Sequence, residues 1–90
     1  MTVDLIGNHP INQYGLETQY NYKHSVECMA SQLYNHVFSE PSAWDFNTLI
    51  SSFIDCSDYD YRGQMRGLSI SMKIFRRDVI RHVRNRLAKY

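Results

Sequence analysis

Residues 26–38, VECMASQLYNHVF, carry the clearest helical pattern in this 90-residue chain. Apolar side chains recur there at intervals of three and four residues, which places them on one face of an α-helix. The members of this face are Val26, Met29, Ala30, Leu33, Val37 and Phe38. The pattern predicts a helix that begins near Tyr22. It should end near Ser39, because Glu40 precedes Pro41 and the residue before a proline disfavours helical backbone angles.

A second stretch with helical spacing follows within a few residues. Its apolar positions are Phe46, Leu49, Ile50, Phe53 and Ile54. Ser42 is the predicted N-cap, and Asp45 is predicted to lie in the first turn, where a negative charge suits the helix dipole. Because the connection is short, we expect the two helices to be antiparallel neighbours that form a helical hairpin over residues 22–56.

The last third of the chain fits two patterns. Residues 68–74 alternate between apolar and polar as in a half-buried strand, so the sequence leaves open whether residues 68–75 are helix or strand. A longer window favours a basic C-terminal helix over residues 68–89, preceded by a short helix around residues 59–66. The apolar face of the longer helix would be Leu68, Met72, Phe75, Val79, Val83 and Leu87.

Turn-forming residues are spaced through residues 1–20 and predict an irregular N-terminal arm. Residues 21–90 are predicted to form a single helical domain, since a chain of this length has room for one core. The predicted fold is therefore all-α, with three or four helices. Its expected core residues are Val26, Met29, Leu33, Val37, Phe46, Leu49, Ile50, Phe53, Met72, Phe75, Val79 and Val83.

The formal net charge of +1 conceals a division of charge along the chain. Residues 1–60 hold eight acids and one base, which gives −7, whereas residues 61–90 hold nine bases and one acid, which gives +8. Such an asymmetry suggests an anionic partner for the basic end, an internal electrostatic contact, or both.

Four cations follow one another at helical spacing opposite the apolar face of the basic helix. These are Lys73, Arg77, Arg81 and Arg84. A row of this kind can neutralise the phosphates of a nucleic acid, and the leading hypothesis is a small regulatory protein that docks an anionic partner, with nucleic acid favoured. The alternative is a solvated face, with Arg76 and Arg86 paired to the acidic hairpin.

A different class of function remains open: a protein-binding adaptor or inhibitor, including one that acts as a homodimer. Its contacts would come from tyrosines and acids, and the candidate residues are Trp44, Asp58, Tyr59 and Tyr61. Tyrosine supplies a large contact area with few rotatable bonds, which suits protein interfaces. Trp44 also has a structural interpretation, as a residue packed under the N-terminal arm or against the third helix.

Catalytic, metal and membrane functions have little support in the sequence. His24 and Cys28 are one helical turn apart, but two ligands do not make a zinc site, and no cofactor motif is present. Cys28 and Cys56 are expected to be free thiols, and the apolar runs are too short to span a bilayer. We therefore expect a cytoplasmic, non-enzymatic protein with no metal, no cofactor, no small-molecule substrate and no membrane contact.

Overall fold

The computed structural model describes residues 9–39 and 45–88, which form four α-helices and one 3-10 turn. In chain order the elements are η1 (Pro10–Gln13), α1 (Leu16–Ser39), α2 (Phe46–Cys56), α3 (Tyr61–Gly67) and α4 (Met72–Leu87). The predicted all-α class is confirmed. The ambiguity of residues 68–75 is also resolved, because residues 68–71 form a turn and residues 72–75 are helical.

Helix α1 begins at Leu16, earlier than the predicted start near Tyr22. The Gly15 carbonyl accepts the first helical hydrogen bond, from the Gln19 backbone N–H at 3.0 Å. The apolar pattern missed this start because Leu16 is 83% exposed and does not extend the buried stripe. The described part of the predicted arm, residues 9–20, thus contains η1 and the first residues of α1. Residues 1–8 lie outside the described residues.

Helix α2 is capped by Asp45, not by Ser42 as the sequence suggested. The Asp45 carboxylate accepts hydrogen bonds from the Thr48 backbone N–H at 3.3 Å and from the Thr48 hydroxyl at 2.7 Å. These hydrogen bonds lower the pKa of the Asp45 carboxyl. Thr48 therefore explains why Asp45 is the N-cap and not a residue of the first turn, since Thr48 supplies two hydrogen-bond donors to the Asp45 carboxylate. Ser42 lies outside the described residues.

The turn between α3 and α4 ends one helix and begins the next within four residues. The Ile70 N–H donates to the Met65 carbonyl at 2.9 Å and the Ser69 N–H donates to the Arg66 carbonyl at 3.1 Å, which together form a Schellman motif. Ser69 holds the left-handed position at φ 56°, and Ser71 caps α4 by accepting from the Ile74 N–H at 3.2 Å. The predicted helix over residues 68–89 therefore starts at Met72.

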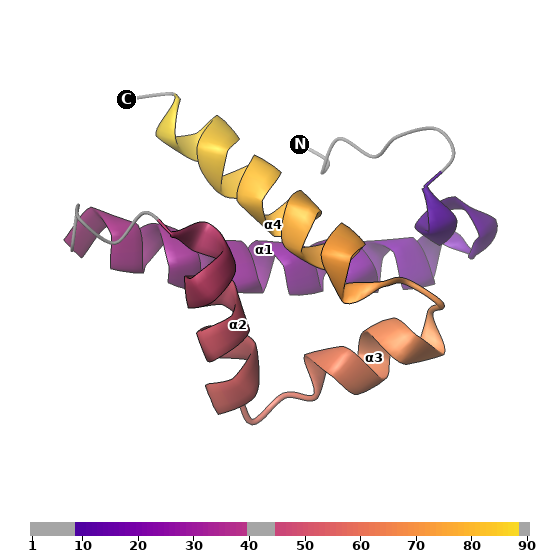
Figure 1. Ribbon diagram of the computed structural model, residues 1–90. Helices are drawn as coiled ribbons and strands as arrows, with labels where there is room; N and C mark the ends of the chain where they lie inside the picture. The colour runs from indigo at the N-terminus through magenta and orange to yellow at the C-terminus, as the bar shows by residue number, and fades with distance from the viewer. Residues whose placement is uncertain (1–8, 40–44, 89–90) are drawn as a thin grey trace.

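The helices do not form the predicted antiparallel hairpin. Helix α1 packs most extensively against α4, which crosses it in the same general direction, whereas α2 runs across α1 rather than back along it (Figure 1). The physical reason is that α4 covers much of the apolar face of α1. Helix α2 buries its own stripe, Phe46, Ile50 and Ile54, beside that crossing.

The core largely matches the predicted set. Nine of its twelve members are buried, while Leu49, Phe53 and Met72 are partly buried against the core. Helical spacing did not identify several other buried residues, because they lie in η1, in α3, in the turn or at the edge of a predicted helix. The core residues missed in this way include Ile11, Tyr22, Tyr61, Met65 and Ile70.

A buried polar cluster joins η1, α1 and α4. The Asp78 carboxylate is 1% exposed and accepts hydrogen bonds from the Tyr22 hydroxyl and from His9 Nε2, the latter at 2.9 Å. His9 Nδ1 accepts from the Ile11 backbone N–H at 3.1 Å, so the proton of a neutral ring lies on Nε2 and points at Asp78. Every group of the cluster is satisfied, which is what allows a carboxylate to be buried.

The left-handed backbone of Ser69 predicts a stabilising substitution. Ser69→Gly should raise the free energy of unfolding by roughly 0.5–1 kcal/mol, because glycine adopts positive φ without the clash of a Cβ atom. Ser71→Ala is the matched control, and loss of its cap should lower the same quantity by about 1 kcal/mol. Urea denaturation followed by circular dichroism measures both. A less stable Ser69→Gly protein would contradict the assigned turn geometry.

The buried cluster predicts a large cost for removing its acceptor. Asp78→Ala should lower the free energy of unfolding by about 3–5 kcal/mol, because it leaves the donors of His9 and Tyr22 buried without an acceptor. Asp55→Ala is the matched control, since Asp55 pairs with Arg62 at the exposed surface, and it should cost less than about 1 kcal/mol. Equal effects of the two substitutions in chemical denaturation would refute the structural role of Asp78.

The same cluster makes stability depend on alkaline pH. Burial, reinforced by the Asp78 carboxylate, raises the pKa of the Tyr22 phenol. Above about pH 10 the unfolded chain releases this proton while the folded protein retains it. The contribution of Tyr22 to the free energy of unfolding is therefore complete below that pH and falls by about 1.4 kcal/mol per pH unit above it. Denaturation curves between about pH 8 and pH 11 should show a steeper loss for the native sequence than for Tyr22→Phe. Parallel losses would contradict this assignment.

Candidate functional site

Helix α4 separates its apolar and charged residues onto opposite faces. Phe75, Val79 and Val83 are fully buried, whereas Lys73, Arg77 and Arg84 are exposed and Arg81 is partly exposed. The spacing of three and four residues produces this division, because 3.6 residues complete one helical turn. The four predicted cations therefore do share the outer side of one helix.

The solvent-facing part of α4 lines an open groove together with Asn47 and Ser51 of α2. The groove has a volume of about 1170 Å³. Its eleven lining residues are Asn47, Ser51, Ser71, Lys73, Ile74, Arg76, Arg77, Ile80, Arg81, Arg84 and Asn85. Five of these residues are cationic and none is acidic, so a ligand in the groove would meet positive charge, amide and hydroxyl groups and two isoleucines.

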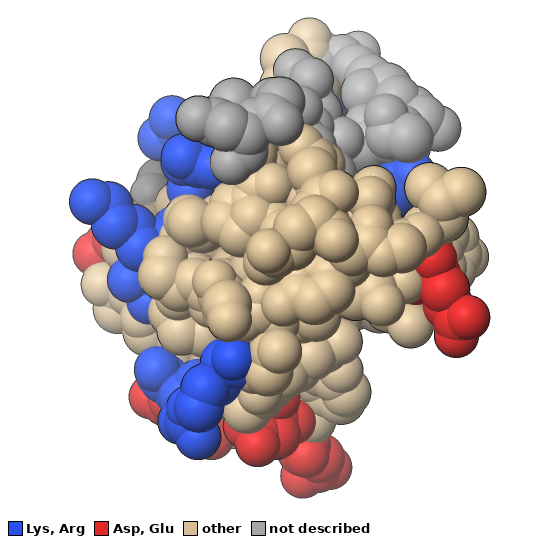
Figure 2. All heavy atoms as spheres, turned by 90° about the vertical axis from the view of Figure 1, so that its right-hand side faces the viewer, with Lys and Arg blue, Asp and Glu red and all other residues tan. Residues whose placement is uncertain are grey.

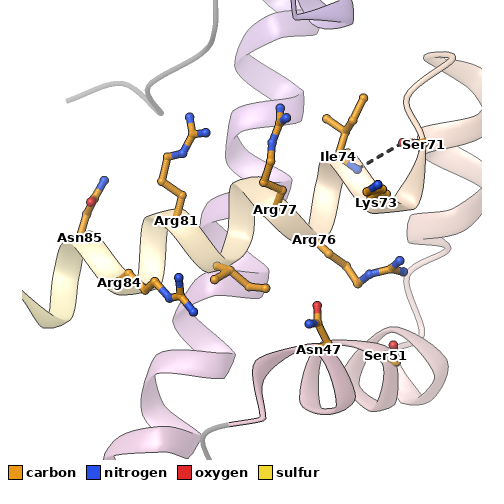
Figure 3. Close-up of a pocket in the computed structure, with 11 residues that line it drawn as sticks. Asn47, Ser51, Ser71, Lys73, Ile74, Arg76, Arg77, Arg81, Arg84 and Asn85 are labelled. Carbon is orange, nitrogen blue, oxygen red and sulfur yellow. Dashed lines mark hydrogen bonds between the residues drawn. The ribbon is translucent and has the colours of Figure 1, made fainter.

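The cations of the groove point to two sides of α4 (Figure 3). Arg77 and Arg81 project to the side of Ile74, whereas Arg76 and Arg84 project toward α2, where Asn47 lies. All four predicted cations line the groove together with Arg76, but Arg77 and Arg81 do not face α2 (Figure 3). From the sequence, Arg76 was expected only as a partner of the acidic hairpin, although its spacing of three residues from Lys73 places the two side chains on neighbouring turns of one helix.

The surroundings of Lys73, Arg76, Arg77 and Arg84 leave most of the charge of these four side chains available. Arg77 Nε lies 3.8 Å from Asp78 Oδ1, a long contact to a carboxylate whose short hydrogen bonds go to His9 and Tyr22. Within residues 9–39 and 45–88, no carboxylate forms an ion pair with Lys73, Arg76 or Arg84.

Two arginines of α4 lie over aromatic rings. The guanidinium carbon of Arg84 is 5.8 Å from the centre of the Phe46 ring, and that of Arg86 is 4.2 Å from the centre of the Tyr34 ring. The expected pairing of Arg86 with an acid of the hairpin is therefore replaced, among the described residues, by a cation–π contact. Both contacts hold the arginine stems against the protein while the charges remain accessible to solvent.

The charge division of the sequence is partly visible on the surface. Figure 2 shows most of the visible Lys and Arg atoms along the left side of the molecule, with acidic atoms at the bottom, on the right and in small patches beside the basic atoms on the left. The one acid after residue 60 is Asp78, which is 1% exposed. The outer side of α4 therefore presents cations without an exposed acid between them.

The predicted protein-contact residues are not brought together as one exposed surface. Asp58 is exposed and Tyr59 is 49% exposed, with its hydroxyl donating to the side chain of Gln64. Tyr61 is only 6% exposed and packs with its ring centre 5.6 Å from that of Phe75, so its predicted place at the surface is corrected to the core. Trp44 lies outside the described residues.

The remaining candidates for chemistry do not assemble a larger site. Cys28 Sγ lies 3.6 Å from His24 Nε2 on the exposed side of α1, and both cysteines are free thiols. In the part of the chain that the structure describes, no group of three or more histidine, cysteine or acidic side chains could hold a metal ion. None of the described helices is long and apolar enough to cross a membrane.

Comparisons of the chain with models of protein families, with curated proteins and with solved structures find no match. The function is therefore inferred from the groove and its chemistry.

Proposed function

We propose that this protein is a small non-enzymatic regulatory protein that binds nucleic acid through the basic groove of α4. The observation that carries this proposal is the lining of the groove, in which the described residues contribute five cations and no acid to one open hollow. A surface made only for solubility normally mixes charges of both signs. A groove of one sign concentrates an oppositely charged polymer and increases its rate of association.

The chemistry of the lining suits phosphate groups. Arginine presents a planar fork of donors that can contact two phosphate oxygens at once, and four of the five cations are arginines. Asn47, Ser51 and Asn85 add neutral donors, which position a nucleic-acid backbone without specifying its sequence. The open form of the groove also suits a long polymer better than a small molecule, which usually occupies an enclosed cavity.

The alternative of a protein-binding adaptor has weaker support. Of its four candidate residues, Tyr61 is buried, and Asp58 and Tyr59 lie in a short polar loop before α3. The neighbouring Asp55 is already paired with Arg62 at 2.8 Å, which offsets part of the acidic charge there. The groove therefore offers the larger and more uniform binding surface.

Replacing the four predicted cations tests the proposal. The variant with Lys73, Arg77, Arg81 and Arg84 all changed to Gln should bind random-sequence DNA or RNA at least about tenfold more weakly. The plot of log affinity against log salt should become shallower by up to about 4, because each phosphate contact contributes close to one unit. Fluorescence anisotropy across a salt series measures both quantities.

The control is Lys23→Gln combined with Arg86→Gln, which removes two charges that do not line the groove. This control should retain nearly the full salt dependence. Absence of salt-sensitive binding by the native protein, or equal binding by the quadruple variant, would rule out the proposal. Capture of a protein partner that survives the quadruple change but is lost in Tyr59→Ala would instead assign the function to the adaptor class.

A further inference from the structure

Helices α3 and α4 form one rigid unit. Four residues, 68–71, connect them, and the Schellman motif at one end and the Ser71 cap at the other leave little freedom in the connection. Ile70 in the turn is 3% exposed and Met65 of α3 is fully buried. The Tyr61 ring of α3 lies 5.6 Å from the Phe75 ring of α4, centre to centre. The orientation of α4 relative to α3 is therefore fixed by buried contacts as well as by the short turn.

A short helix, a turn of three or four residues and a second helix are the parts of a helix-turn-helix unit. In such units the second helix lies in the major groove of DNA and the first crosses the phosphate backbone. We infer that α3, the turn and α4 constitute a helix-turn-helix that places the basic side of α4 in the major groove of double-stranded DNA. This inference rests on the proposed function and specifies the kind of nucleic acid and the manner of its recognition.

The dimensions of α4 agree with this placement. Its 16 residues extend about 24 Å, and a helix with its side chains is about 10–12 Å wide, close to the width of the major groove of B-form DNA. Its first turns carry Lys73, Arg76 and Arg77, which all line the basic groove of the protein. Arginine and lysine at such positions can contact both phosphates and the acceptor edge of guanine.

The lining of the groove argues against the other forms of nucleic acid. Single-stranded nucleic acids are commonly held by aromatic side chains on which the bases stack, and none of the eleven lining residues is aromatic. Double-stranded RNA has a deep, narrow major groove that does not admit a helix. Duplex DNA is the form whose major groove accepts a basic helix without an aromatic platform.

Helix α3 supplies a backbone contact of the expected kind. Arg66 lies in its last turn, is exposed, and forms no ion pair with a carboxylate of the described residues. Arg62, the other arginine of α3, is engaged by Asp55. Arg66 is therefore the residue of the first helix that is available for a phosphate of the DNA backbone.

The form of nucleic acid provides the first test. The full chain should bind a duplex DNA of about 25 base pairs at least about tenfold more tightly than duplex RNA or single strands of the same sequence, at equal salt. Equal or tighter binding of RNA or of single strands would overturn the helix-turn-helix inference and leave the proposed function standing. Failure to bind any of them would overturn both.

Occupying the major groove provides the second test. Duplex DNA with glucosylated 5-hydroxymethylcytosine has the same backbone charge but a filled major groove, and it should bind at least about tenfold more weakly than unmodified DNA. Distamycin, which fills the minor groove of A·T sequences, should leave the affinity unchanged. Equal affinity for the two DNAs, or competition by distamycin, would overturn the inference.

Substitutions connect these results to the two helices. Lys73→Gln combined with Arg77→Gln should abolish the difference between unmodified and glucosylated DNA, whereas the control Lys23→Gln with Arg86→Gln should preserve it. Arg66→Gln should reduce the slope of log affinity against log salt by about 1 on duplex DNA. An unchanged slope in Arg66→Gln, with circular dichroism showing a native fold, would contradict the role of α3.

Discussion

The buried carboxylate of Asp78 holds three elements of the fold together. One side chain of α4 accepts hydrogen bonds from His9 before η1 and from Tyr22 of α1, so three elements meet at a single group. A carboxylate is costly to bury unless such donors are in place. The packing of α4 against α1 is thereby coupled to the position of η1. The contact also fixes the rotation of α4 about its own axis, with its apolar face on α1 and its cations toward solvent.

The same residue explains the surface charge of the candidate site. Asp78 is the one acid among the last thirty residues, and its position inside the protein leaves no acidic side chain of α4 at the surface beside the cations. Cations on neighbouring turns repel one another, which opposes folding. The contacts of Arg84 with Phe46 and of Arg86 with Tyr34 reduce that cost, because an aromatic face attracts a cation. The interaction that stabilises the fold and the surface proposed to bind nucleic acid therefore belong to one helix.

The turn between α3 and α4 contains a strained backbone conformation at Ser69, and this conformation helps to orient the two helices. Ser69 adopts a left-handed conformation that costs a residue other than glycine about 1–2 kcal/mol. Such a conformation persists where the surroundings determine it. Here the two hydrogen bonds of the Schellman motif and the burial of Met65 and Ile70 hold Ser69 in this conformation. The result is a short connection that fixes the orientation of α4 relative to α3.

Helical periodicity is a local property of the chain, so the all-α class, most of the core and the four cations Lys73, Arg77, Arg81 and Arg84 could be predicted from the sequence. The direction of α2 (Figure 1), the burial of Tyr61 and the inclusion of Arg76 in the groove could not be predicted in this way. Nor could the pairing of His9 with Asp78, which are 69 positions apart. These features depend on which surfaces meet after the helices form, and the spacing of residues within one helix carries no information about that.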